Sequence, residues 1–326
     1  MVDQTLTERK TFDITFFNDV CDGLSQNPKR ISSKYFYDER GDTLFQQIMH
    51  LEEYYPMNCE YEIFTTHKEA ILNCFIKGSR GFNLIEYGAG DAYKTKVLIN
   101  HFISNQVDFI YSPVDISDNV LNILENSLLS KFPELHLDKI AAEYFDALDV
   151  INKRNCDKKV ILFLGSNIGN FTWEETDAFF HSISDKGDSG DLLMIGFDLQ
   201  KDPGTILKAY NDSKGVTRDF NLNLLQRINN ELDADFNING FYHYPTYDPI
   251  SGEAKSFIVS KTHQTVSIGN PAQTFTFKAG ECIFTEVSRK YTEEQIDALA
   301  EKTGFKVVEK YFDKKHYFCD AILEVL

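Results

Sequence analysis

The segment Leu84-Ile85-Glu86-Tyr87-Gly88-Ala89-Gly90-Asp91 constrains the fold most, because an apolar run leads directly into two closely spaced glycines. This pattern predicts a buried strand, a tight turn and then a helix that carries Lys94 and Thr95. Glycine has no Cβ, so such a turn lets the backbone pass close to a bound nucleotide or nucleoside. A plain strand–turn–helix connection gives the same pattern. The segment lacks the third glycine of GxGxxG and the Gly-Lys-Ser/Thr of a phosphate loop.

Strands and helices alternate after this turn. The run Val160–Leu164 is wholly apolar, which is typical of a strand buried on both faces of a parallel sheet. Thr172 and Glu175 have the spacing of a capping box at a helix start. Further strands are expected at 84–87, 108–114 and 191–197, an extended stretch at 138–145, and helices at 92–102 and 118–129. The alternation predicts a doubly wound α/β sheet.

The flanking regions have a different pattern. Helices are expected at 12–24 and 42–51, then a stop at Tyr54-Tyr55-Pro56 and a helix at 58–76. Two helices within 203–232 separate near Gly215, and short strands follow at 257–259, 264–268 and 274–277. A capping box at Thr292 opens a helix to about 302, and strands at 306–311 and 317–324 close the chain. We therefore expect an α/β domain of 61–197 and 287–326, and a smaller α+β domain of 1–60 and 198–286.

Composition excludes several kinds of partner. The 326 residues carry a net charge of −17, which opposes binding to nucleic acid or anionic membranes. No apolar stretch approaches the ~20 residues that span a bilayer. The six cysteines show no CxxC spacing, so we expect a reducing cytoplasm and no zinc. No metal is assigned to the isolated histidines His243, His263 and His316.

Polar residues stand where successive parallel strands are expected to end, which is where open α/β sheets bind ligands. Asp115 could accept both hydroxyls of a ribose, or it could cap the next helix. Lys94 could reach a cofactor carboxylate, or lie on the surface. The loop Gly165–Asn170 offers asparagine amides for an amino-acid substrate, or simply forms a turn. Together these features favour the nucleoside site of a methyltransferase that uses S-adenosylmethionine, with Glu143 and Tyr144 near the adenine.

A further segment, Thr285-Glu286-Val287-Ser288, leads back into the α/β domain. Side chains alternate between the two faces of an extended segment, so Glu286 and Ser288 lie on the same face, where they could hydrogen-bond a polar ring. An exposed strand with its polar side chains outward would show the same pattern.

Taken together, these segments resemble the histidine-specific Nα-methyltransferases of the ergothioneine pathway, which form hercynine. The resemblance covers nearly the whole chain, and its Gly-Ser-x-Ile-Gly-Asn and Thr-Glu-x-Ser motifs are much more specific than ExGxG. It includes Tyr35-Phe36-Tyr37-Asp38-Glu39-Arg40-Gly41, Glu53-Tyr54-Tyr55-Pro56, Glu86-Tyr87-Gly88-Ala89-Gly90 with Lys94-Thr95, 163–170, Tyr210 with Gly215-Val216-Thr217, 231–236 and Thr285-Glu286-Val287-Ser288.

The resemblance implies a class I methyltransferase domain with a Rossmann-like sheet, and a substrate domain formed by the insert and the N-terminal helices. S-adenosylmethionine would be bound by Glu86, Gly88, Gly90, Lys94, Asp115, Glu143 and Tyr144. Asn170 and Tyr210 would hold the carboxylate of L-histidine beside Gly165, Tyr54 and Tyr37 would lie by its α-amine as the catalytic residues, and Glu286 and Ser288 would bond the imidazole.

Two positions depart from the family pattern. Glu143 stands where an aspartate is expected, and Ser256 stands where well-known members place a methionine beside the imidazole. The expected reaction is three methyl transfers to the α-amine by a monomer. Alternatives are methylation of another small amine, such as a ring nitrogen of histidine or a tryptophan-like amino acid, a non-catalytic cofactor-binding module and, as the weakest, a dehydrogenase.

Overall fold

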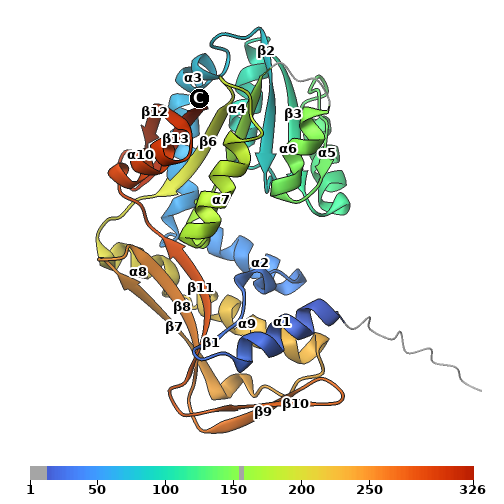
Figure 1. Cartoon of the computed structure of the whole chain (residues 1–326), viewed down its shortest axis with the longest axis vertical. Helices are drawn as coiled ribbons and strands as arrows, with labels where there is room; N and C mark the ends of the chain where they lie inside the picture. Colours follow the sequence, from blue (N-terminus) through green and yellow to red (C-terminus); the bar gives the residue numbers. More distant parts are fainter. Residues whose placement is uncertain (1–12, 154–157) are drawn as a thin grey trace, which may run out of the picture. The chain divides into compact units, whose positions relative to one another are not determined.

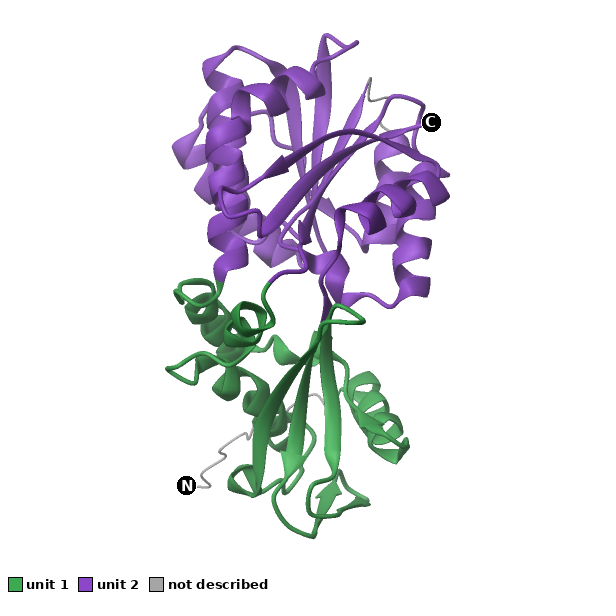
Figure 2. Cartoon of the chain, turned by 90° about the vertical axis from the view of Figure 1, so that its left-hand side faces the viewer, with its two compact units in different colours: residues 1–54, 202–287 green, residues 55–201, 288–326 purple. Residues whose placement is uncertain are grey.

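A computed structural model of the chain describes residues 13–153 and 158–326 (Figure 1). These residues form two compact units, each made from two segments of the chain (Figure 2). We call residues 55–201 and 288–326 the α/β unit, and the residues up to 54 with 202–287 the α+β unit. The first boundary falls at 54/55 rather than 60/61, because helix α3 already begins at Tyr55. The other two boundaries between the units fall at 201/202 and 287/288, whereas the predicted boundaries were 197/198 and 286/287.

The α/β unit contains a seven-stranded sheet in the order β12-β13-β6-β5-β2-β3-β4. From β4 to β6 neighbouring strands are parallel, whereas β13 runs antiparallel to both β6 and β12. The strands are β2 (Gly81–Tyr87), β3 (Asp108–Asp115), β4 (Ile140–Ala141), β5 (Lys159–Phe163), β6 (Leu192–Asp198), β12 (Phe305–Phe312) and β13 (Phe318–Val325). The predicted doubly wound sheet is confirmed. Its order reverses between β2 and β5, which is the position where such sheets bind ligands.

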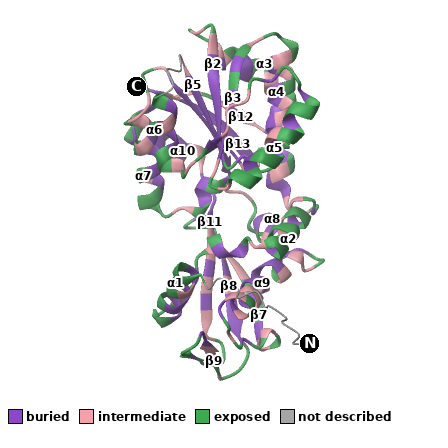
Figure 3. Cartoon of the chain, turned by 90° about the vertical axis from the view of Figure 1, so that its right-hand side faces the viewer, coloured by how far each residue is buried: buried purple, intermediate pink, exposed green. Residues whose placement is uncertain are grey.

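Helices cover both faces of this sheet: α3, α4 and α5 lie on one side, and α6, α7 and α10 on the other (Figure 3). They are α3 (Tyr55–Phe75), α4 (Thr95–Ser104), α5 (Asp118–Lys131), α6 (Tyr144–Asn152), α7 (Trp173–Ser184) and α10 (Glu293–Lys302). Both predicted capping boxes are present, at Thr172 with Glu175 and at Thr292 with Gln295. Each box pairs two backbone N–H groups that would otherwise have no partner at the helix start.

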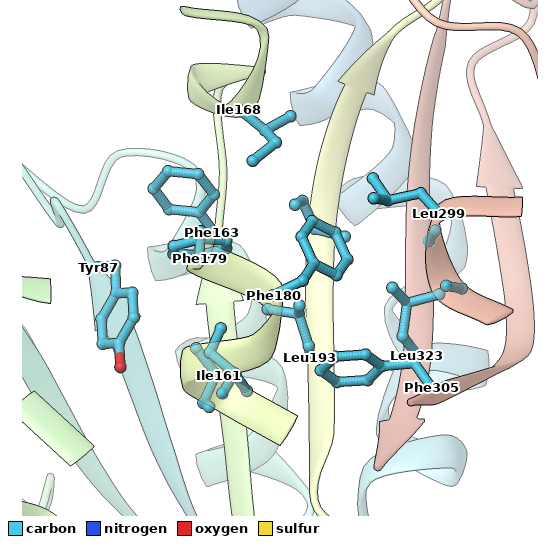
Figure 4. Packing of buried hydrophobic residues seen from close by; sticks show 14 of the residues in the cluster. Tyr87, Ile161, Phe163, Ile168, Phe179, Phe180, Leu193, Leu299, Phe305 and Leu323 are labelled. Carbon is cyan, nitrogen blue, oxygen red and sulfur yellow. The ribbon is translucent and has the colours of Figure 1, made fainter. Parts of the chain in front are cut away.

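One core layer of the α/β unit lies between the sheet and helices α6, α7 and α10 (Figure 4). Phe163 of β5 packs on Phe179 of α7 with 4.5 Å between ring centroids, and Phe180 meets Phe305 edge to face. All of β5 is buried, as its apolar run predicted. Fully burying one such side chain contributes about 1.5–3 kcal/mol to the free energy of folding. This packed layer therefore stabilises the sheet whose strands β2, β5 and β6 carry the candidate site at their carboxyl ends.

The α+β unit combines a four-stranded sheet, in the order β1-β11-β8-β7, with a β9–β10 hairpin. Its strands are β1 (Lys29–Arg30), β7 (Phe241–Asp248), β8 (Glu253–Ser260), β9 (Gln264–Ile268), β10 (Gln273–Phe277) and β11 (Cys282–Arg289), the last of which runs past the unit boundary. Its helices are α1 (Ile14–Ser25), α2 (Glu39–Met49), α8 (Pro203–Tyr210) and α9 (Val216–Glu231). Gly215 caps α9 with φ of 75°, which confirms the predicted break between two helices.

Two local predictions were wrong, and one strand was missed. Tyr54-Tyr55-Pro56 does not stop a helix: Pro56 lies in the first turn of α3, where its missing N–H costs nothing. The extended stretch 138–145 contains only the short β4, and helix α6 begins at Tyr144. Strand β7 was not predicted, because its alternating tyrosines and histidine are not an apolar run. Among the described residues, no helix is long and apolar enough to cross a membrane.

Candidate active site at the ends of the parallel strands

The glycine turn after β2 takes the conformation that its sequence predicted. Gly88 and Gly90 have φ angles of 70° and 53°, in the left-handed region that favours glycine. The Gly88 N–H donates to the Val114 carbonyl across 3.1 Å, which ties the turn to β3. A Cβ on Gly88 would lie 2.7 Å from the Tyr144 hydroxyl. A side chain at residue 88 would therefore collide with Tyr144, so this position requires glycine.

Glu86 lies beneath this turn and is buried. Thr95 Oγ1 donates to its Oε1 across 2.7 Å, and Tyr111 Oη donates to its Oε2 across 2.5 Å. Burial raises the pKa of Glu86 to about 7, although the hydrogen bonds from Tyr111 and Thr95 act in the opposite direction. The carboxyl group thus joins β2, β3 and α4, and it stabilises the turn from below.

Asp115 and Tyr144 lie on the β3 side of the turn. Asp115 is the last residue of β3, and its Oδ1 accepts the Ser117 N–H across 2.9 Å. Ser117, and not Asp115, caps helix α5, so the alternative role of Asp115 as a helix cap is wrong. Tyr144 stacks on Tyr87 with 5.3 Å between centroids, and Glu143 precedes it as the exposed N-cap residue of α6. Burial raises the pKa of Tyr144, so its hydroxyl keeps its proton.

Lys94 forms an ion pair with Glu60, a buried residue of α3 that the sequence did not single out. The same Glu60 carboxylate accepts the Gly165 N–H, with 2.9 Å from nitrogen to Oε1. Glu60 therefore connects the residue before α4 to the loop after β5. Lys94 Nζ also lies 3.6 Å from the position of a Cβ on Gly165, so the ammonium borders both strand ends.

A further acid, Asp320 of β13, is fully buried in the same region. Burial raises the pKa of Asp320 well above its usual value, and the neighbouring Glu60 carboxylate raises it further. Since one lysine stands beside two carboxyl groups, Asp320 is the group that holds a proton.

The loop Gly165–Asn170 packs tightly against the end of β11. Gly165 and Ser166 have φ angles of 79° and 59°, and the 3₁₀ helix η2 covers Asn167–Asn170. A Cβ on Gly169 would lie 2.6 Å from the Arg289 carbonyl oxygen and 3.4 Å from Ser288 Oγ. The loop that carries Gly165 and Asn170 thus lies beside Ser288 at the end of β11, and Asn170 is exposed.

A buried charged cluster, formed by Tyr55, Asp198, Lys201 and Lys290, lies behind this loop. Asp198, the last residue of β6, accepts from Tyr55 Oη at 2.9 Å and from Lys290 Nζ at 2.7 Å, and it pairs with Lys201. Burial by itself raises the pKa of Asp198, but the Lys290 and Lys201 ammonium groups outweigh it and lower the pKa below its usual value. Asp198 is therefore ionised.

The remaining candidates belong to the α+β unit. Tyr37 and Tyr54 both pack edge-on against Phe45, with centroid distances of 5.5 and 6.5 Å. Tyr210 ends helix α8, and half-buried Glu286 lies on β11 two residues before Ser288. Ser256 is buried, and its Oγ lies 3.4 Å from His243 Nε2. The serine that departs from the family pattern thus has a polar neighbour.

Sequence reasoning missed Glu60, Asp198, Lys201 and Lys290. Glu60 had a weak signal, because it falls on the otherwise apolar face of a predicted helix, between Cys59 and Ile63. Asp198 follows a buried strand just as Asp115 does, so its position could have been noticed. Lys290 had no signal, since only the folded chain brings it to Asp198, whereas Lys201 stands three residues after Asp198 and could have been noticed with it.

The order of the seven strands, with β13 reversed, and the glycine turn at the point of reversal define a class I S-adenosylmethionine-dependent methyltransferase. The residues fit this cofactor, because no heavy atom lies within 4 Å of a Cβ position on Gly90, which leaves the turn open there, and Asp115 stands at the end of the next strand. The model of the family described as "Histidine-specific methyltransferase, SAM-dependent" matches residues 16–325. The chain belongs to this family.

Three relatives show what this chain is similar to. Histidine N-alpha-methyltransferase of Mycolicibacterium smegmatis is 32% identical over 90% of this chain and 90% of its own length. Ergothioneine biosynthesis protein 1 of Schizosaccharomyces pombe is 27% identical over 89% of this chain and 38% of its own length. L-tryptophan methyltransferase of Psilocybe serbica is 26% identical over 92% of this chain and 90% of its own length.

Proposed function

We propose that this methyltransferase transfers three methyl groups in succession to the α-amine of L-histidine, and so forms hercynine for ergothioneine biosynthesis. The observation that carries the proposal is the match of the histidine-specific family over residues 16–325. The chain also keeps Glu286 and Ser288 on one strand, two residues apart, so both side chains face the same way. A carboxylate and a hydroxyl complement the two ring nitrogens of imidazole.

S-adenosylmethionine supplies the methyl group and would be held by Gly88, Gly90, Lys94, Asp115, Glu143 and Tyr144, above the buried Glu86. The open space at Gly90 lets the cofactor approach the backbone of the turn that Gly88 begins, and the Asp115 carboxylate can accept ribose hydroxyls. The ion pair with Glu60 fixes the Lys94 ammonium in place.

The substrate carboxylate would be held by Asn170 and Tyr210, beside Gly165. Glu60 already accepts the Gly165 N–H, so Gly165 contributes space there rather than a donor. The amine must lose a proton before each transfer, because an ammonium has no lone pair. Tyr54 and Tyr37 would orient that lone pair, and their ring faces can stabilise the cation that forms.

A second candidate substrate is an amino acid of the tryptophan type. The observation that favours it is Ser256, a small buried residue where the family pattern has methionine. Against it stands Glu286, because an indole carbon offers the carboxylate no hydrogen-bond donor, whereas an imidazole N–H does.

We further propose a cytoplasmic monomer that binds neither nucleic acid nor membranes. The net charge of −17 opposes phosphate-rich surfaces, and the cysteines that the structure describes, Cys21, Cys59, Cys74, Cys282 and Cys319, are free thiols. Cys156 lies outside the described residues. Light scattering of the purified protein tests the oligomeric state.

Mass spectrometry of the product tests the main proposal. Purified protein with S-adenosylmethionine and L-histidine should add one, two and finally three methyl groups, all on the α-nitrogen. Parallel reactions with L-tryptophan and ring-methylated histidine separate the two candidates. Absence of any methylated histidine would contradict the proposal, and the Glu286→Ala variant should lose most of its preference for histidine.

A further inference from the structure

Ser288 has a lysine neighbour that restricts how its hydroxyl can bond. Lys290, two residues along the chain, is buried, and its Nζ lies 3.0 Å from Ser288 Oγ. An ammonium group has only hydrogens to offer, so Ser288 Oγ must be the acceptor in this hydrogen bond. The single hydroxyl hydrogen of Ser288 is then directed to another partner.

Asp198 holds the Lys290 side chain in place. Its Nζ lies 2.7 Å from Asp198 Oδ2, and both side chains are almost fully buried. Lys201 pairs with the other oxygen of the same carboxylate, and Tyr55 Oη donates to it as well. Two ammonium groups thus face one carboxylate, and this excess of positive charge favours a Ser288 hydroxyl that donates away from Lys290.

We propose that Lys290 is a positioning residue that fixes Ser288 as a hydrogen-bond donor, so that the site selects a substrate ring with an acceptor nitrogen. The inference rests on the proposed contact of Ser288 with the substrate ring. Glu286, as a carboxylate, only accepts, so the pair complements a ring with one N–H and one unprotonated nitrogen. Neutral imidazole has this pattern, whereas indole has an N–H and no acceptor nitrogen.

Protonated imidazole also fails to match, because both of its nitrogens are donors. The affinity for L-histidine should therefore fall as the pH drops below the imidazole pKa of about 6.5. Without the Lys290 ammonium, the Ser288 hydroxyl can turn and accept instead, so this pH dependence should become weaker.

The test compares L-histidine with L-3-(2-thienyl)alanine, whose five-membered ring has no nitrogen. Calorimetry in the presence of S-adenosylhomocysteine measures the affinity of the protein for each amino acid. The turnover of both amino acids is then measured with S-adenosylmethionine. Lys290→Met should raise the KM and Kd for histidine roughly 10-fold, the factor expected for one hydrogen bond, while thienylalanine binding and kcat stay within about 2-fold. Lys290→Arg, which also only donates, should recover part of the selectivity.

Lys159→Met is the matched control. Lys159 is also a buried lysine of the α/β unit and pairs with Asp188 and Asp191, but it opens β5 at the opposite end from the site. This variant should lose stability without changing the histidine-to-thienylalanine ratio. If Lys290→Met does not fold, Lys290→Gln takes its place, because the amide still donates to Asp198 but can also accept from Ser288.

A double-variant cycle completes the test. In a Ser288→Ala background, Lys290→Met should have no further effect on the Kd for histidine beyond about 2-fold. If the effects of the two substitutions on the Kd for histidine multiply, Lys290 does not act through Ser288. If histidine and thienylalanine lose affinity equally, the role of Lys290 is structural. Either result would overturn the inference. Absence of histidine turnover by the unaltered protein overturns the proposed function and this inference together, whereas histidine turnover with unchanged selectivity in Lys290→Met overturns the inference alone.

Discussion

The carboxylate of Glu60 accepts the backbone N–H of Gly165 across 2.9 Å, although 105 residues separate the two along the chain. The same carboxylate pairs with Lys94. A buried acid of α3 thus holds together the two strand ends at which the sheet order reverses. The cofactor side of the site therefore depends on a residue that need not touch the cofactor.

Replacing Glu60 should weaken both the fold and the cofactor site. Glu60→Ala leaves the Lys94 ammonium without this ion pair and the Gly165 N–H without its acceptor. Removing one partner of a buried pair costs about 3–5 kcal/mol, so we expect a loss of about 3 kcal/mol in urea unfolding. S-adenosylmethionine should also bind more weakly in calorimetry.

Glu125→Ala is a matched control for this variant. Glu125 pairs with Lys139 at the surface of the same unit, where such a pair is worth about 0–1 kcal/mol. Equal losses in the two variants would show that Glu60 does not hold the strand ends together.

Gly88→Ala should disturb the turn through two separate effects. The φ of 70° costs a non-glycine residue roughly 1–2 kcal/mol, and the new Cβ would lie 2.7 Å from the Tyr144 hydroxyl. Gly78→Ala is the control, because its φ is 79° but no heavy atom lies within 4 Å of the added Cβ. Adding Tyr144→Phe should bring the unfolding free energy of Gly88→Ala close to that of the control. No recovery would mean that Tyr144 does not limit the turn.

The sequence predicted the fold wherever local patterns were strong. The apolar run at Val160–Leu164, the two capping boxes and the break at Gly215 each depend on residues close together in the chain, and all are present. The prediction failed where one residue is compatible with two different local structures. Pro56 resembles a helix stop, but it becomes part of α3 because the first turn of a helix needs no N–H there.

For the candidate site, the sequence predicted the residues that follow strands but not those that support them. Gly88, Asp115 and Gly165 could be found because parallel strands end at one edge. Glu60 and Lys290 act through contacts with residues 105 and 92 positions away, at Gly165 and Asp198. No local pattern encodes such pairs, since burial and pairing of charges are decided only when the sheet forms.

Glu86 should make the α/β unit less stable as the pH rises. Its pKa in the folded chain is about 7, above the value of 4.5 for an exposed glutamate, so the folded state binds the proton more tightly. This stabilisation is fully present below pH 4.5, the pKa of the glutamate in the unfolded chain, and it is lost as the pH rises through about 7. Between pH 5 and pH 7 the loss should be about 2 kcal/mol.

Glu86→Gln removes this titration and keeps a side chain of the same shape for Tyr111 and Thr95. The stability difference between the variant and the unaltered protein, from urea unfolding at both pH values, should therefore shift in favour of the variant at pH 7. Parallel pH profiles for the two proteins would contradict the prediction.

His243 should act with the opposite sign in the α+β unit. Burial lowers its pKa from 6.5 to about 4, so the folded state favours the neutral ring. Its contribution is present above pH 6.5 and is lost as the pH falls toward 4, with about 2 kcal/mol lost between pH 7 and pH 5. His243→Gln should abolish that part of the acid sensitivity. His181→Gln, at an exposed histidine of α7, should leave the profile unchanged, and an equal response of both variants would mean that burial of His243 is not the cause.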